Sequence, residues 1–216
     1  MNLPACSESG TGADPIVANW DGLSEESLIL ALEPPATECV ETGLLGRWGR
    51  WRDGDGSAPG LGLTITARSA YRFRVAAVYV DALSRRLRLS QDLCERVRTA
   101  LQEAVVNAVV HGNLGLPAGR RDNLQEIAEW QHTVETLLAL DRSGQSAIRI
   151  VARWTPAMLD IAIRDSGSGF ESGVLSDHGP DSAFRGSGRG LSLICAFSDY
   201  AAVTRGESTV EIGFHL

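Results

Sequence analysis

A helical period of apolar and polar residues runs through residues 90–113 and is the clearest pattern in the chain. Every fourth position is apolar, so a helix would align these positions as one buried stripe. The stripe consists of Leu93, Val97, Leu101, Val105 and Val109. Ser90 precedes the run and is a favourable N-cap residue. The pattern therefore predicts a helix that begins after Ser90 and is broken near Gly112.

The rest of the chain alternates between strand-like and helix-like patterns. Alternation with a period of two predicts strands, and apolar residues three or four apart predict helices. Strands are expected at residues 61–66, 148–154, 158–165, 200–204 and 209–216, and helices at 70–87, 123–140 and 189–197. The last two pairs of strands are close enough in sequence to form antiparallel hairpins.

Residues 1–60 give weaker signals, with clusters of proline, glycine and serine. A strand is expected at residues 27–32 and a short helix around residues 37–51. The acidic, glycine-rich run that follows has the composition of a linker. Tryptophan is frequent for a tail, which favours packing of part of this segment on the domain or on a partner. A loosely ordered extension is the alternative. The tryptophans are Trp20, Trp48 and Trp51.

Length and composition indicate the domain organisation. The chain has 216 residues, 44% of them hydrophobic, which is enough for one domain with its own core. We expect a partly ordered N-terminal extension and linker at residues 1–60, followed by one domain at residues 61–216. The domain carries a helical insertion at about residues 114–146.

A second stripe on the predicted helix is polar and consists of Glu103, Asn107 and His111. A carboxylate can take a proton from water or a hydroxyl, and a carboxamide oxygen suits the oxygen ligands that magnesium prefers. Small alanines beside the stripe would let a ligand approach. The same spacing also fits an ordinary solvated helix face, so the stripe alone does not distinguish a ligand site from a solvent-exposed surface.

Two glycine-rich segments follow this helix. Residues 165–169 read DSGSG, and residues 186–191 read GSGRGL. Either segment alone is weak evidence, because such runs also form turns and helix caps. In this order after Glu103 and Asn107, they resemble the Asn box and the two glycine boxes of the GHKL ATPases. Their spacing and the short closing segment look most like the anti-sigma factor serine-protein kinases.

The resemblance covers residues 61–216 and implies a fold and ligands. The fold would be the Bergerat or histidine kinase-like ATPase fold, a two-layer α/β sandwich with a mixed, mostly antiparallel sheet and helices on one face. ATP and Mg²⁺ would lie between the helices and a lid. The polar residues 170–185 have the composition of such a lid.

The resemblance also implies a role for each box. Asp165 would accept a hydrogen bond from the adenine amino group, which selects adenine over guanine. Gly167 and Gly169 would let the backbone come close to the base. Asn107 would bind Mg²⁺ next to the phosphates, and Glu103 would be the base that activates the attacking hydroxyl or water.

The second glycine box would meet the phosphates through the N-terminus of the following helix. The chain has no lysine, so all 20 basic residues are arginines. This excludes a P-loop lysine and a Schiff-base mechanism. Arg185 and Arg189 flank the box and could contact phosphate. The box residues expected at the nucleotide are Gly186, Gly188, Gly190 and Leu191.

Net charge and cysteine spacing indicate which ligands and which cellular compartment the protein has. The net charge of -7 argues against a nucleic-acid surface. The four cysteines lie far apart without metal-ligand spacing, which predicts reduced thiols in a cytoplasm. No apolar run is long enough to span a membrane, and the N-terminus lacks the features of a signal peptide. We therefore expect a cytoplasmic protein that binds neither nucleic acid nor membrane.

The anti-sigma factor kinases fit better than the other branches. A complete histidine kinase needs an acceptor histidine before the Asn box, and none precedes it. The histidines are His111, His132, His178 and His215. Gyrase and MutL relatives carry a further domain with a catalytic lysine. The resemblance thus implies an ATP-dependent protein serine kinase.

Its implied partners are an anti-sigma factor antagonist of the STAS type, which it would phosphorylate, and a sigma factor, which it would bind. Two alternatives remain open. One is a kinase-inactive nucleotide-binding module that switches partners. The other is a catalytic domain that phosphorylates a separate histidine phosphotransfer protein in trans. A homodimer is one assembly that the sequence leaves open.

Overall fold

The computed structural model describes residues 15–45, 60–118, 123–167, 189–203 and 208–216. The described strands are β1 (Val17–Trp20), β2 (Glu38–Glu41), β3 (Gly60–Thr66), β4 (Ala147–Trp154), β5 (Met158–Arg164), β6 (Tyr200–Val203) and β7 (Thr209–His215). They form one seven-stranded sheet in the order β1-β2-β3-β4-β5-β7-β6. The pairs β1/β2 and β2/β3 are parallel, and all other neighbours are antiparallel.

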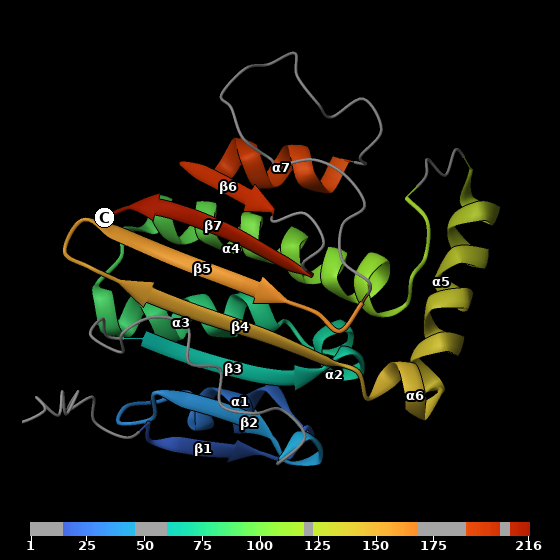
Figure 1. Ribbon diagram of the computed structural model, residues 1–216, viewed down its shortest axis with the longest axis horizontal. Coiled ribbons are helices and arrows are strands. Elements are labelled where there is room, and N and C mark those ends of the chain that lie inside the picture. The colour runs from blue at the N-terminus through green and yellow to red at the C-terminus, as the bar shows by residue number, and fades with distance from the viewer. Residues whose placement is uncertain (1–14, 46–59, 119–122, 168–188, 204–207) are drawn as a thin grey trace, which may run out of the picture.

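Helices cover one face of this sheet. The described helices are α1 (Glu25–Ala31), α2 (Ala67–Arg72), α3 (Val75–Leu87), α4 (Gln91–Asn107), α5 (Leu124–Ala139), α6 (Asp141–Gly144) and α7 (Arg189–Phe197), with a 3₁₀ turn η1 (Thr42–Leu44) and a π-helical turn η2 (Ala108–Asn113). Figure 1 shows α1, α3, α4 and α7 behind the strands and α5 and α6 at one end. A continuous apolar core fills the space between the layers. The expected two-layer fold is confirmed.

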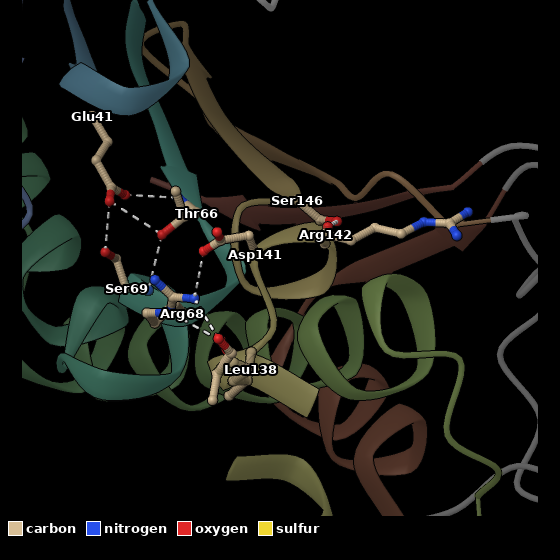
Figure 2. A network of polar contacts seen from close by, with 9 residues as sticks. Glu41, Thr66, Arg68, Ser69, Leu138, Asp141, Arg142 and Ser146 are labelled. Carbon is tan, nitrogen blue, oxygen red and sulfur yellow. Dashed lines mark hydrogen bonds and ion pairs between the residues drawn. The ribbon is translucent and has the colours of Figure 1, made fainter. Parts of the chain in front are cut away.

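Residues 15–45 belong to the same sheet and core. Trp20 is buried and contacts Phe73 edge-on, with 5.4 Å between ring centroids. Figure 2 shows the Glu41 carboxylate at the start of α2. It accepts hydrogen bonds from Thr66 N–H at 2.7 Å, the Thr66 hydroxyl at 3.1 Å and the Ser69 hydroxyl at 2.9 Å. The N-terminal segment is therefore tied to the rest of the protein by packing and by hydrogen bonds.

The strand expected at residues 27–32 is wrong, because this stretch lies in and just after helix α1. Ser24 caps the helix by accepting the Ser27 N–H at 3.1 Å. Leu28 and Leu32 lie four residues apart and are both fully buried, whereas Leu30 is 71% exposed. Leu28 and Leu32 thus lie on the face that packs against the core, and Leu30 lies on the solvent face, as expected of a helix.

The helix expected around residues 37–51 is also wrong in its described part. Residues 38–41 form β2, which is paired on both sides, and only η1 follows. The pairing partners β1 and β3 are remote in sequence from one another. Tertiary pairing of this kind overrides a weak local helix preference.

The helix expected at residues 70–87 is two helices. The chain breaks between α2 and α3, because Phe73 is extended (φ -106°, ψ 157°). Phe73 turns to pack on Trp20, and the Arg74 N–H donates to the Glu25 carboxylate at 2.8 Å instead of to a helix carbonyl. Contacts with Trp20 and Glu25 of the N-terminal segment therefore stabilise the break between α2 and α3.

The other predicted strands and helices are observed, with ends that differ by one residue at most. The central helix is α4, capped by Ser90, whose side chain accepts the Leu93 N–H at 3.3 Å. It continues into η2. Within the described part of the chain, no helix combines the length and the apolar character needed to cross a membrane.

Candidate functional site

Glu103 and Asn107 lie together on α4 and face the N-terminus of α7. A Cβ placed on Gly190 would lie 3.0 Å from Asn107 Oδ1 and 3.1 Å from Glu103 Oε2. Both oxygens thus converge on one point beside the second glycine box. A side chain at position 190 would be tightly placed against the carboxylate and the carboxamide, so glycine keeps the space between them open.

Helix α7 is fixed against α4 by its far end as well. Arg96 donates to the Phe197 carbonyl at 3.2 Å and forms an ion pair with Asp199 at 2.7 Å. The Asp199 carboxylate also accepts the His215 N–H at 2.7 Å. Ile194 is fully buried between these contacts. The position of Gly190 over Glu103 and Asn107 is therefore held by the whole length of α7.

Asp165 follows β5 directly and is 6% exposed. Among the described residues, its carboxylate accepts one hydrogen bond, from Gly167 N–H to Oδ1 at 2.7 Å. Burial raises the pKa of Asp165 from 3.8 to about 6, and the Gly167 hydrogen bond and the nearby Arg164 charge offset only part of this rise. A buried carboxylate with so few donors is suited to accept a hydrogen bond from a ligand.

The π-helical turn η2 brings the end of the central helix onto Asp165. Its hydrogen bonds join residues five apart, as from Leu114 N–H to the Val109 carbonyl at 2.9 Å. Gly112 therefore takes the place that His111 would have in an α-helix. A Cβ on Gly112 would lie 2.5 Å from Asp165 Oδ2 and 2.6 Å from Oδ1.

His111 leaves the expected polar stripe for the same reason. It is exposed, and its Nδ1 lies 2.6 Å from the Leu116 carbonyl oxygen. This contact fixes the chain just after η2. The histidine thus has a structural role at the end of the helix, and the stripe that faces the site consists of Glu103 and Asn107.

Asn113 and Ser208 hold the backbone around Asp165. Asn113 Oδ1 accepts the Ser166 N–H at 2.8 Å, and its Nδ2 donates to the Ala147 carbonyl at 3.3 Å. Ser208 accepts the Asp165 N–H at 3.0 Å and donates from its hydroxyl to the Asp165 carbonyl at 2.8 Å. Sequence reasoning missed both residues, and also the closeness of Gly112. The only signal was the HGN run at the helix end.

The structure thus places two groups of predicted residues along α4 and η2. Glu103 and Asn107 meet Gly190, while Asp165 and Gly167 lie against Gly112. Leu191 is half-buried and packs on the core. Arg189 is the first residue of α7. Gly169, Arg185, Gly186, Gly188 and the lid expected at residues 170–185 lie outside the described residues.

The donor set beside Gly190 fits magnesium. The described residues hold no cluster of three His, Cys, Asp or Glu side chains that could bind a metal alone. Mg²⁺ bound with a nucleotide needs only one or two protein oxygens, because phosphates and water supply the rest. Asn107 Oδ1 is suited to be the protein ligand.

Comparison with known proteins identifies the family of the chain. Residues 65–214 match the family model of the histidine kinase-like ATPase domain. The match covers more than half of the chain, so the protein belongs to this family and to the GHKL ATPase superfamily. The domains of this superfamily bind ATP, usually together with Mg²⁺. No curated protein matches the chain.

Proposed function

We propose that this protein is an ATP-dependent protein serine kinase of the anti-sigma factor type. It phosphorylates a STAS-type anti-sigma factor antagonist and binds a sigma factor. The observation that carries the proposal is the convergence of Glu103 Oε2 and Asn107 Oδ1 beside Gly190. A base and a metal ligand lie together where a helix N-terminus favours phosphate.

In this proposal, each end of the site has a separate task. Asp165 accepts a hydrogen bond from the adenine amino group, and the N-terminal N–H groups of α7 meet the phosphates. Asn107 would hold Mg²⁺ through its carboxamide oxygen, and the bound ion would supply positive charge beside the phosphates. Glu103 takes the proton of a serine hydroxyl while the hydroxyl oxygen receives the γ-phosphoryl group and ADP leaves.

A cleft between α3 and α4 supports access of a protein substrate to Glu103. Its volume is about 600 Å³, and it is lined by Arg74, Ala77, Asp81, Arg98, Thr99, Gln102 and Glu103. The acceptor hydroxyl must reach both Glu103 and the nucleotide. Because Glu103 is one of the lining residues, a group that enters the cleft can approach its carboxylate.

The direct test is phosphoryl transfer from radiolabelled ATP to purified STAS-domain antagonists. We expect a labelled antagonist whose phosphate survives acid, as serine phosphate does and histidine phosphate does not. Acid-labile label on a phosphotransfer protein would replace the proposal by a histidine kinase catalytic domain. ATP binding without transfer to any protein or to water would leave a nucleotide-gated partner-binding module.

A Glu103→Gln variant tests the base. Glutamine keeps the size and hydrogen bonding but cannot take a proton, so transfer should fall by roughly two to four orders of magnitude at nearly unchanged ATP affinity. Glu95→Gln is the matched control, since Glu95 is exposed on the same helix and should retain full activity. Transfer at the wild-type rate by Glu103→Gln would exclude Glu103 as the base.

A further inference from the structure

Asn113 connects three segments that meet around Asp165. Its Oδ1 accepts the Ser166 N–H at 2.8 Å, so it holds the peptide that follows Asp165. Its Nδ2 and the Ser166 hydroxyl both donate to the Ala147 carbonyl, at 3.3 Å and 3.1 Å. The end of η2, the start of β4 and the first glycine box are thus joined through one side chain.

Gly112 limits where the Asp165 carboxylate can lie. Any Cβ at Gly112 would lie 2.5 Å and 2.6 Å from the two carboxylate oxygens, which is closer than real Cβ contacts. A Cβ on Gly167 would in turn lie 2.5 Å from the Gly112 carbonyl oxygen. The two backbones therefore touch, and the carboxylate is confined beside them.

We infer that Gly112 and Asn113 are positioning residues that set the preference of the site for adenine over guanine. Both act through Asp165, whose direction they fix from the π-helical turn. A carboxylate aimed at the exocyclic amino group of adenine meets a keto oxygen in guanine, and this discrimination requires a fixed carboxylate. The inference rests on the proposed role of Asp165 in binding adenine.

The same two residues link the ends of the site. Asn107, the proposed magnesium ligand, ends α4, and η2 follows without a break. The adenine end and the phosphate end are therefore carried by one continuous helical segment. Loosening Asn113 should alter base recognition first, because the Arg96 contacts that fix α7 against α4 do not involve Asn113.

Calorimetric titration of the purified protein with ATP and with GTP, both with Mg²⁺, tests the inference on Asn113→Ala. We expect the Kd for ATP to rise about tenfold, because a misdirected Asp165 carboxylate loses its hydrogen bond from adenine, while the Kd for GTP changes little. The ATP-to-GTP preference should fall accordingly. Asn123→Ala is the matched control, because Asn123 caps the remote helix α5 by accepting the Glu126 N–H at 2.9 Å.

Gly112→Ala is the second variant, with Gly43→Ala as its control. A Cβ on Gly43 would make only an ordinary contact, 3.4 Å from Gln145 Oε1. Gly112→Ala should also lose preference for ATP, since the added methyl group displaces the carboxylate. Thermal unfolding shows whether each variant is folded. If Gly112→Ala does not fold, the ATP-to-GTP preference of Asn113→Ala tests the inference.

The outcomes distinguish the role of Asp165 in adenine binding from the positioning role of Gly112 and Asn113. A wild-type protein that binds ATP and GTP equally, or neither, contradicts the role of Asp165 in adenine binding. A wild-type preference for ATP that both folded variants retain overturns the role of Gly112 and Asn113. A preference lost equally in Asn123→Ala would show a general effect of stability and would overturn it too.

Discussion

At the scale of single residues, Asp165 carries the chemistry that depends most on pH. Its folded pKa of about 6 lies above its ordinary value of 3.8, because burial disfavours the charged form. The folded protein therefore gains stability as the pH falls from about 6 towards 3.8 and loses that contribution as the pH rises through 6. A ligand that donates a hydrogen bond to the carboxylate favours the ionised form of Asp165 and so lowers its pKa.

Carboxyl NMR titration of Asp165 measures this directly. We expect a pKa near 6 in the free protein and a lower value with ATP bound, since the adenine amino group stabilises the ionised form. ATP affinity should weaken below about pH 6 as a result. Asp165→Asn removes the resonance and most of the affinity. A pKa that ATP does not change would contradict adenine binding by this residue.

Asn107 should matter only through the metal. In Asn107→Ala we expect weaker ATP binding in the presence of Mg²⁺ and little change in its absence, because the carboxamide oxygen is the proposed ligand. Titrations with Mg²⁺ and with a chelator make the comparison. Equal loss under both conditions would show instead that Asn107 supports the packing of α7.

At the scale of elements, α2 holds the inserted helix α5 in place. Figure 2 shows Arg68 pointing to the end of α5. It donates to the Leu138 carbonyl at 2.9 Å and to the Ala139 carbonyl at 3.2 Å, and lies 3.7 Å from the Asp141 carboxylate. These bonds satisfy carbonyls that a helix end leaves free. Most of the first half of α5 is exposed, so its anchorage lies at this end.

Arg68→Met should loosen α5 without affecting the nucleotide site. Two hydrogen bonds to backbone carbonyls are lost, which we expect to cost about 1–2 kcal/mol of stability. Hydrogen exchange should become faster within α5, with unchanged ATP affinity. Arg72→Met on the same helix is the control, since the Arg72 guanidinium packs over the Phe73 ring, 5.1 Å from its centroid. Unchanged exchange would show that apolar packing alone holds the insertion.

At the scale of the whole molecule, the N-terminal segment completes the sheet. Arg149 on β4 is 5% exposed and forms an ion pair with Glu38 on β2 at 2.6 Å. The same guanidinium donates to the Thr64 hydroxyl at 2.8 Å. This ion pair spans β3 and joins β2 to β4, whose first residue, Ala147, accepts the Asn113 hydrogen bond beside the site.

Glu38→Gln should therefore destabilise the entire fold. Removing one charge of a buried pair leaves the other in a poorly solvated place, with an expected loss of about 3 kcal/mol. Denaturant unfolding measures it, and Glu33→Gln at an exposed position is the control. A loss as small as that of the control would show that the pair is solvated and contributes little.

The sequence by itself determined the elements that depend on local patterns. The stripe of α4 from Leu93 to Val109, its Ser90 cap and the strand alternation require only neighbouring residues, so they were predictable. The order of the Asn box and the glycine boxes likewise indicated the superfamily. Most of the described fold and the residues Glu103, Asn107 and Asp165 could be named in this way.

Only the tertiary structure decided which remote backbones meet. Residues 38–41 form a strand because β1 and β3 pair with them. The helix expected at residues 70–87 is interrupted at Phe73, whose ring packs on Trp20. Because of the π-helical turn, Gly112 and not His111 lies beside Asp165. A four-residue spacing assumes a regular α-helix and does not predict this shift. Contacts between distant segments follow from packing of the whole chain, whereas helical and strand periods follow from the residues next to one another.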